Sequence, residues 1–317
     1  MEKRSWKPIT DYLDKLNKLD PIPTDTSEHW RPDPTIRACI FDIYGTLIIS
    51  ASGDIDQAEF SSQSLEMALE KAHIELQASD DQSRQIILEK LLKDFRRAIE
   101  KEHNRVKKRG IPHPEIIITD IWRRILKQYH KEQKIRITKH SEIKIYTFLF
   151  ELMSNRIYPM PYMKQVLDQL SQSAMPLGII SNAQFYTPMI MNHFLEAPMS
   201  ETTHIRHFEP RLSIYSYQAG RSKPDVYLFH ILTERLENHY GIKPEEALFV
   251  GNDMYKDIWP ASQAGLKTAL FAGDRRSLRL RQNQAEVKNL QPEFIIKDLR
   301  SIPGILGHGV SHSKDIY

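Results

Sequence analysis

The sequence predicts an α/β fold, namely a doubly wound parallel sheet with an all-helical segment inserted after its first strand. From Arg37 onward, short apolar runs alternate with segments of helical periodicity. Such alternation is typical of β-α-β units, whose parallel sheet is covered on both faces. Residues 51–157 break the alternation and show helical periodicity alone. These two observations together define the predicted architecture.

The elements of the sheet layer can be assigned in chain order. Short apolar runs predict strands over 37–42, 177–181, 212–216, 247–251, 267–271 and 293–297. Apolar residues at helical spacing predict the covering helices over 162–173, 185–195, 225–239 and 255–264. The parallel sheet follows from this order, because each strand is separated from the next by a crossover segment.

The inserted segment is predicted to fold as helices over 56–76, 83–109, 114–130 and 141–154. Gly110 follows a basic turn, which suits the end of the second helix. Trp122 lies at helical spacing with other apolar residues, so we expect it in the core of this segment rather than, with Arg123, in a pocket wall. The basic stretch 95–110 is interpreted as a solvated helix face rather than a substrate-attracting patch. An insertion directly after the first strand lies above the site end of the sheet, and we therefore expect a cap.

The N-terminal region is predicted to be an amphipathic helix over 6–19, followed by an extended Pro- and Asp-rich connector over 20–34. We expect it to pack on the main body rather than to recruit a partner. The predicted organisation is 1–34 as N-terminal helix and linker, 35–50 with 158–305 as the sheet domain, 51–157 as the cap, and 306–317 as a tail.

Composition excludes several classes of function. The 44 Lys and Arg residues against 41 Asp and Glu give a net charge of +3, which is too weak to indicate nucleic-acid binding. The single cysteine, Cys39, excludes an internal disulfide and a cysteine metal cluster, and we expect it to be a small buried hydrophobe. No apolar run approaches the ~18 residues of a membrane helix, and the first residues lack a signal-peptide pattern. We therefore expect a cytoplasmic protein that binds no membrane; the sequence carries no signal for an oligomeric state.

Polar residues follow the strand candidates at four points along the chain. These residues are Asp42, Ser181 with Asn182, Lys223, and the acids Asp253 and Asp257. The carboxyl ends of parallel strands face the same way, so we expect these groups to converge. A carboxylate, a hydroxyl, a cation and a pair of acids are what nucleophilic displacement on an anionic substrate beside a metal requires.

Each of these residues also has a purely structural explanation when it is taken alone. An Asp after a strand is often a helix N-cap, and this applies to Asp253. Ser181 and Asn182 could cap a helix as well, and Lys223 before a proline could be a solvated loop residue. Their occurrence together, each behind a strand pattern, favours the functional interpretation.

The segments "FDIYGTL", "ISN", "SKPD" and "VGNDMYKD" resemble, in order, the four signature motifs of the haloacid dehalogenase-like hydrolases. The resemblance covers about residues 37–300 and implies a Rossmann-like core with a type-one cap. It implies that Asp42 is the nucleophile, which forms an aspartyl ester or an aspartyl phosphate. By the same resemblance, Ser181, Asn182 and Lys223 bind the anionic group of a small-molecule substrate.

The resemblance also implies a Mg²⁺ site made by Asp42, Asp253 and the backbone carbonyl of Tyr44, with Asp257 orienting Lys223. Hard oxygen ligands of this kind suit Mg²⁺. Tyr44 is the departure from the pattern, because the phosphatases of this family carry a second Asp at this position. Tyrosine, with a pKa near ~10, is a poor replacement for that acid and base, and losing such a group typically costs ~10²–10⁴ in rate.

Two features of the motifs point in opposite directions. The 2-haloacid dehalogenases of the family have a Tyr at the position of Tyr44, and a departing halide needs no proton. Those dehalogenases are metal-free and lack the acid found here at Asp253, and residues 47–83 contain none of the arginine that they use for the halide. We therefore predict Mg²⁺-dependent hydrolysis of a small phosphorylated metabolite. The alternatives are a metal-free 2-haloacid dehalogenase-like hydrolase and a non-catalytic binding protein.

A cap residue could replace the missing second acid. The family's phosphonate hydrolase uses a cap lysine, for which Lys71, Lys90 and Lys93 are candidates here. Candidate acids and bases in the cap are Glu59, His73, His103, His113 and Glu115. Each of these is more often a surface residue on an amphipathic helix than a catalytic group.

Overall fold

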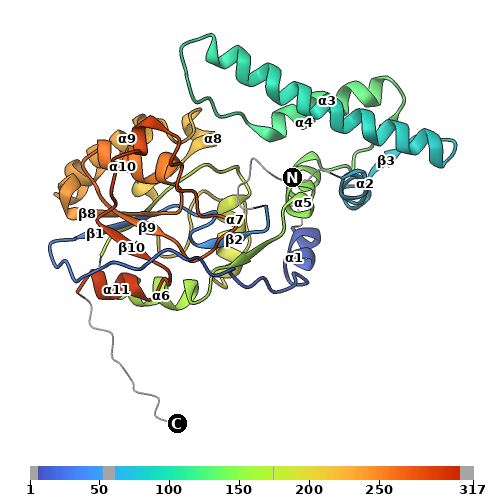
Figure 1. Ribbon diagram of the computed structural model, residues 1–317. Helices are drawn as coiled ribbons and strands as arrows, with labels where there is room; N and C mark the ends of the chain where they lie inside the picture. Colours follow the sequence, from blue (N-terminus) through green and yellow to red (C-terminus); the bar gives the residue numbers. More distant parts are fainter. Residues whose placement is uncertain (1–5, 53–60, 174, 308–317) are drawn as a thin grey trace.

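The computed structural model describes residues 6–52, 61–173 and 175–307, and its centre is a six-stranded parallel sheet (Figure 1). The strands lie in the order β10-β9-β8-β1-β6-β7. Their bounds are β1 Ala38–Phe41, β6 Leu177–Ser181, β7 Ser213–Tyr215, β8 Ala247–Gly251, β9 Lys267–Phe271 and β10 Phe294–Ile296. All five neighbouring pairs are parallel. The six predicted strands and the Rossmann-like α/β fold are confirmed.

β1 lies at the middle of this sheet, and its burial explains its sequence. Cys39 is opposite Leu177 of β6 on one side and Leu248 of β8 on the other. Every residue of β1 is buried, because helices cover both faces of the sheet. A strand of this kind is a continuous apolar run rather than an alternating one. Cys39 is buried as expected.

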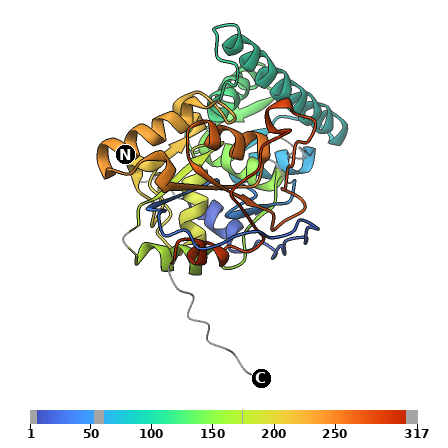
Figure 2. The ribbon, with the colours of Figure 1, turned by 60° about the vertical axis from the view of Figure 1, so that its left-hand side comes forward.

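The covering helices divide between the two faces. α6 (Met163–Ser171), α7 (Thr187–Phe194) and α11 (Ser301–Ile305) pack on the face that carries Cys39 and Phe41. α9 (Tyr227–Tyr240) and α10 (Trp259–Gln263) pack on the face that carries Ala38 and Ile40. Figure 2 shows the two layers after a turn of 60°. The helix predicted over 255–264 begins instead as the π-helix η4 (Met254–Ile258) and continues as α10. The remaining short elements are α8 (Ser216–Ala219), η2 (Pro210–Leu212), η3 (Pro244–Glu246) and η5 (Ala285–Val287).

The inserted segment contains the four expected helices, which are α2 (Ser62–Lys71), α3 (Asp81–Lys107), α4 (Ile118–Lys131) and α5 (Ile143–Ser154). Trp122 is fully buried among them, and its ring stacks on Phe95 with 4.0 Å between centroids. The expectation that Trp122 belongs to the core of the segment is confirmed. Arg123 pairs with Asp120 on the same helix.

The insertion is not all-helical, which corrects the sequence prediction. β3 (Ile74–Leu76) pairs antiparallel with β4 (Ile135–Ile137), where helix had been expected up to residue 76. Only one of the three residues of β3 is buried, so the strand shows no apolar run, and the pattern merged with the preceding helix. Residues 56–60 of that predicted helix lie outside the described residues.

A second short ribbon joins the insertion to the sheet and was also missed. β2 (Ile48–Ser50) pairs antiparallel with β5 (Ile157–Pro159). Next to it, Ser50 Oγ and the Asn155 side chain exchange hydrogen bonds of 2.9 and 3.2 Å. The chain therefore enters and leaves the insertion side by side.

The N-terminal region packs on the body, as expected, although its helix α1 (Lys7–Leu13) is shorter than the predicted one. Ile9 and Leu13 are buried, and α1 lies against α5. The connector is fixed to the sheet edge, because Thr24 donates to the carbonyl of Ala272 at 2.6 Å and His29 bridges Ile295. The predicted tail beyond residue 307 lies outside the described residues. Among the helices described, none has the length and apolarity needed to cross a membrane.

Candidate active site

Asp42 is placed by the middle of the sheet. It follows β1 directly, and its backbone N–H donates to the carbonyl of Val250 in β8 at 2.9 Å. The residue is only about 5% exposed. The chain then turns at Gly45, where φ is +90°, and an added Cβ would lie 2.7 Å from the side chains of Asn252 and Ser277. A side chain at this turn would collide, so glycine is required here.

Lys223 joins the nucleophile candidate to a second carboxylate. Its Nζ lies 2.7 Å from Asp42 Oδ1 and 2.5 Å from Asp257 Oδ1. Burial alone would lower the pKa of Lys223, but the two carboxylates outweigh it and raise the pKa. The ammonium therefore stays charged, and it offsets the negative charge on Asp42 in a site that excludes most water.

Asp257 holds Lys223 in this position. Its Oδ1 accepts from Lys223, while Oδ2 accepts from the backbone N–H groups of Asn252 and Asp253 at 3.0 Å each. Gly251 makes the approach possible, because a Cβ there would lie 2.5 Å from the Cβ of Asp257. Burial raises the pKa of Asp257, and Lys223 opposes that shift. This is the geometry that the predicted orienting role requires.

Ser181 and Asn182 come together with Lys223, but their states differ. Asn182 accepts from the Lys223 backbone N–H at 2.7 Å and donates to its carbonyl at 3.3 Å. Ser181 is the last residue of β6, and its Oγ is buried with no hydrogen-bond partner among the described residues. A buried hydroxyl without a partner is costly. Ser181 is therefore available to a ligand, whereas Asn182 fixes the loop of Lys223.

Asp253 has a different environment from Asp257. Its Oδ1 caps η4 by accepting from the N–H groups of Tyr255 and Lys256 at 2.9 and 3.0 Å. Arg281 binds the same carboxylate with Nη2 at 2.7 Å and Nε at 3.1 Å from Oδ2. The helix-cap explanation considered for Asp253 is thus confirmed, and sequence reasoning had missed Arg281.

This environment bears on the predicted Mg²⁺ site of Asp42, Asp253 and the Tyr44 carbonyl. The oxygens are of the right chemical kind, but those of Asp253 are engaged by a guanidinium and two N–H groups. As described, the set does not fit a bound Mg²⁺ unless Arg281 leaves. No group of three or more His, Cys, Asp or Glu side chains in the described part of the chain is arranged to hold a metal ion.

Tyr44 does not take the place of the second acid. Its hydroxyl lies 3.0 Å from Thr187 Oγ1 at the start of α7. Burial raises the pKa of this phenol, and the hydrogen bond with Thr187 only partly opposes the shift. A neutral phenol is a weaker acid than a carboxyl group, and it cannot act as the base that activates water at neutral pH.

A cavity of about 840 Å³ opens beside these groups, between the sheet end and the insertion. Asn182 and Lys223 line it from the core, and α3, α5 and the loop before α4 line it from the insertion. Its Arg, Lys, His and Glu lining residues are Arg96, Lys107, Lys223, Lys256, His103, His113, Glu100, Glu115 and Glu151. Cations outnumber acids in this wall, so the cavity favours an anionic ligand.

Three of the predicted cap groups reach this cavity, namely His103, His113 and Glu115. Glu115 is engaged already, because it accepts from Ser216 Oγ at 2.6 Å and from Gln184 Nε2 at 3.1 Å. Sequence reasoning missed Glu151. The signal that could have found it is a single acid inside the apolar helix "IKIYTFLFELMS", since a helix that is apolar on all sides is buried.

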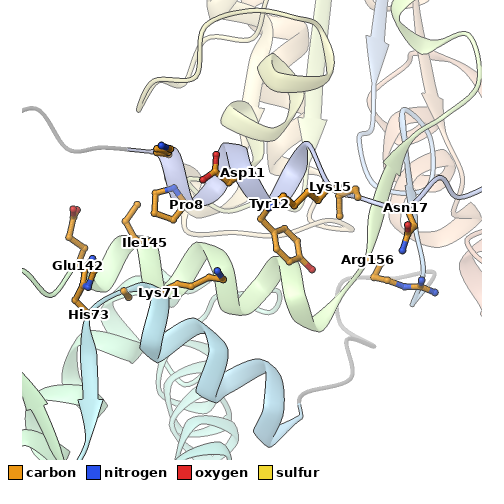
Figure 3. A pocket seen from close by; sticks show the side chains of 13 residues that line it. Pro8, Asp11, Tyr12, Lys15, Asn17, Lys71, His73, Glu142, Ile145 and Arg156 are labelled. Carbon is orange, nitrogen blue, oxygen red and sulfur yellow. The ribbon is translucent and has the colours of Figure 1, made fainter.

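The other cap candidates lie elsewhere. Lys71 and His73 line a second cavity of about 690 Å³ between α1, α2 and α5 (Figure 3). Lys90 pairs with Asp94 at 2.6 Å, and Lys93 lies in a groove along α3. Glu59 is outside the described residues. The lysine-dependent alternative therefore has no support from these three lysines.

Residues 36–265 match the model of the haloacid dehalogenase-like hydrolases. The chain belongs to this family. The match includes Asp42, Lys223 and Asp257, so the residues that converge at the sheet end lie within the region that defines the family.

The solved structures that are similar to this chain include proteins titled as dehalogenases and one titled as a predicted phosphatase. A 2-haloacid dehalogenase from Pseudomonas syringae pv. Tomato DC3000 is 19% identical, with a TM-score of 0.53 over 86% of this chain and 98% of that one. A dehalogenase with an intermediate complex is 15% identical, with a TM-score of 0.47 over 86% and 98% of the two chains. A predicted phosphoglycolate phosphatase from Haemophilus somnus 129PT is 17% identical, with a TM-score of 0.43 over 84% and 96%. These likenesses concern the fold alone. No curated protein matches the chain.

Proposed function

We propose that this hydrolase acts on a small phosphorylated metabolite through a covalent intermediate on Asp42. The observation that carries the proposal is the contact of 2.7 Å between Asp42 Oδ1 and the buried ammonium of Lys223, which also lines the cavity. A carboxylate can attack an anionic phosphoryl group only where positive charge offsets their repulsion. Lys223 supplies that charge at the attacking oxygen.

The proposed reaction has two steps. Asp42 attacks phosphorus, the bond to the leaving oxygen breaks, and an aspartyl phosphate forms. Water then attacks the phosphorus, the bond to Asp42 breaks, and phosphate is released. Ser181 donates a hydrogen bond to a phosphoryl oxygen, since its hydroxyl has no partner among the described residues. Asp257 keeps Lys223 in line with Asp42.

The size and charge of the cavity support a phosphorylated substrate over a 2-haloacid. A volume of about 840 Å³ suits a ligand much larger than a haloacid of two or three carbons. Arg96, Lys107 and Lys256 add positive charge to the wall beyond Lys223. A dianionic phosphate with an organic substituent matches both properties.

Magnesium has no step in this proposal. The requirement for Mg²⁺ that the motifs imply stays a prediction, because Arg281 and two N–H groups engage the carboxylate of Asp253. If the metal binds, Arg281 has to be displaced.

Tyr44 favours the second candidate, a 2-haloacid dehalogenase-like hydrolysis. Its neutral phenol stands where a phosphatase needs an acid, and carbon–halogen displacement needs no proton donor. In that reaction Asp42 attacks carbon, halide leaves, and water attacks the carbonyl carbon of the resulting ester. The third candidate is a binding protein that turns over neither class of substrate.

The fate of water oxygen distinguishes the candidates. The protein is given a panel of phosphate esters, acyl phosphates and 2-haloacids in H₂¹⁸O, and any substrate found is then used in single-turnover amounts. Hydrolysis at phosphorus places ¹⁸O in phosphate and leaves Asp42 unlabelled. Hydrolysis of a carbon ester places ¹⁸O in Asp42, which peptide mass spectrometry detects.

Asp42→Asn is the control for covalent catalysis, and we expect kcat/KM to fall by about 10⁴ or more. Label in Asp42 with release of halide would replace the phosphatase proposal by the dehalogenase. Binding of a phosphorylated ligand without any turnover would favour the binding protein.

A further inference from the structure

Glu151 is an acid in an otherwise apolar environment. It lies on α5, where eight of the other residues are buried: Ile145, Tyr146, Thr147, Phe148, Leu149, Phe150, Leu152 and Ser154. Glu151 itself is half-buried. Its Oε1 is a buried atom with no hydrogen-bond partner among the described residues. Leaving a carboxyl oxygen buried and unpaired costs free energy, so its presence at this position calls for a ligand.

Contacts place this carboxyl beside the reacting end of the sheet. The ring of Phe148, three residues before Glu151, stacks on Tyr186 with 5.2 Å between centroids. The hydroxyl of Tyr186 hydrogen bonds to Glu151. Tyr186 immediately precedes α7, which begins at Thr187, the residue that contacts the hydroxyl of Tyr44. Glu151 is thus connected through α7 to the turn that follows Asp42.

Glu151 also faces the space where a substrate would lie. It lines the same cavity as Asn182 and Lys223, and Lys223 contacts Asp42 directly. Among the acids of that wall, Glu115 has several hydrogen-bond donors, including Ser216, Gln184 and the Ile116 N–H. An unpaired oxygen distinguishes Glu151 from Glu115.

The neighbours of Glu151 favour its protonated form. The titratable groups that interact with it are the phenols of Tyr44, Tyr146 and Tyr186, whose pKa values are all raised. No cation contributes to its titration in the described part of the chain, and burial raises the pKa of Glu151 to about 7. A carboxyl group of this kind can hold a proton near neutral pH and release it during a reaction.

We propose that Glu151 is the proton donor for the leaving group, in place of the acid that Tyr44 replaces. This inference rests on the proposed phosphatase reaction. In the first step Asp42 attacks phosphorus, the bond to the leaving oxygen breaks, and that oxygen takes the proton of Glu151. In the second step the Glu151 carboxylate takes a proton from water, the water oxygen attacks phosphorus, and the bond to Asp42 breaks. Both residues return to their starting state.

The test compares substrates that need a proton on departure with one that does not. Leaving-group release is measured in single turnovers for wild type and Glu151→Gln, using a series of aryl and alkyl phosphate monoesters together with acetyl phosphate. Alkoxides leave poorly without a proton, whereas acetate leaves as the anion. We expect Glu151→Gln to lose about 10²–10⁴-fold on alkyl phosphates. Its single-turnover rate with acetyl phosphate should stay within about threefold of wild type, since general acid catalysis is not needed there.

A matched control comes from the N-cap of the same helix. Glu142 precedes α5 and lines the second cavity, away from Lys223. We therefore expect Glu142→Gln to have the single-turnover rates of wild type with alkyl phosphates and with acetyl phosphate. The slope of log rate against leaving-group pKa should become steeper in Glu151→Gln only. That slope would not change if Glu151 merely supported the fold, and acetyl phosphate turnover reports whether the variant is folded.

The outcomes separate this inference from the proposed function. If wild type hydrolyses alkyl phosphates and Glu151→Gln does so equally well, the proton-donor role is wrong while the phosphatase function stands. If wild type turns over acetyl phosphate but no alkyl phosphate at all, the chain has no such donor and the inference also fails. Absence of turnover with every phosphate overturns the proposed function and this inference with it.

Discussion

The carboxyl end of the sheet and the wall of the insertion face the same cavity, but their polar groups are in opposite states. At the sheet end, Asp257 accepts three hydrogen bonds and Lys223 bridges two carboxylates. In the insertion, the carboxyl group of Glu151 keeps one buried oxygen unpaired. The network of Asp42, Lys223 and Asp257 is complete without a ligand, whereas Glu151 is not, and Ser181 at the sheet end also keeps an unpaired hydroxyl.

This difference is consistent with the two roles proposed above, which are positioning of the nucleophile at the sheet end and proton transfer in the insertion. A nucleophile has to be held in one position before the substrate arrives, and that requires a saturated network. A group that transfers a proton to the substrate must instead keep an oxygen free to form a hydrogen bond with it. The two states therefore correspond to preorganisation on one side of the cavity and ligand dependence on the other.

The largest expected effect on the free energy of unfolding comes from breaking the network of Asp42, Lys223 and Asp257. Lys223→Met leaves Asp42 and Asp257 buried without their cation, and removing one partner of a buried ion pair typically costs about 3–5 kcal/mol. Urea unfolding at pH 7 measures the change in free energy of unfolding. The control is Lys164→Met, which removes a partly exposed pair with Asp168 and should cost less than ~1 kcal/mol. Equal losses in the two variants would show that the sheet end is not a tightly coupled network.

A smaller, pH-dependent effect on the free energy of unfolding is expected from Glu151 in the insertion. The Glu151 carboxyl keeps its proton up to about pH 7 in the folded protein, whereas an unfolded Glu releases it near ~4.3. Between these values the folded state binds more protons, so the stability of wild type falls as pH rises. Relative to Glu151→Gln, wild type should lose up to about 3 kcal/mol between pH 4.5 and 7.

Unfolding curves at several pH values for the two proteins measure this difference. Glu142→Gln serves as the control and should follow wild type across the range. A difference between wild type and Glu151→Gln that is independent of pH would mean that Glu151 titrates as an ordinary exposed acid.

The smallest expected effect is a change in Mg²⁺ affinity at Asp253. Arg281→Ala removes the guanidinium that competes for Asp253. We expect Mg²⁺ to bind about tenfold more tightly to this variant, or ~1.4 kcal/mol, as measured by calorimetry. Arg275→Ala, which removes an exposed arginine of the same segment, should leave the affinity unchanged. If Mg²⁺ binding is the same in all three proteins, Asp253 acts as a helix cap alone.

The saturated region was also the one that the sequence predicted well. Asp42, Lys223 and Asp257 each follow a buried parallel strand or its crossover, and buried parallel strands are conspicuous as apolar runs. Their convergence follows from topology, which needs no knowledge of side-chain direction. The family motifs then added a role to each position.

The insertion was less predictable for physical reasons. Its four helices were evident from their periodicity, but β3, β4 and β5 each have only one buried residue and so show no apolar run. Glu151 and Arg281 owe their environment to tertiary packing, because their partners Tyr186 and Asp253 are distant in sequence. A single sequence contains no local signal for such pairs.

The N-terminal region gives the insertion an attachment that the ribbon of β2 and β5 does not provide. α1 packs on α5, while the residues that follow are fixed to the sheet edge at Ala272 and Ile295. If β2 and β5 were the only connection, the insertion could rotate about these two adjacent strands relative to the sheet domain. The packing of α1 on α5 is a third attachment, away from these strands, and it restricts such a rotation to what the connector between α1 and the sheet edge allows. In this hydrolase, residues outside the cavity therefore hold α5, which lines the cavity through Glu151, against the rest of the molecule.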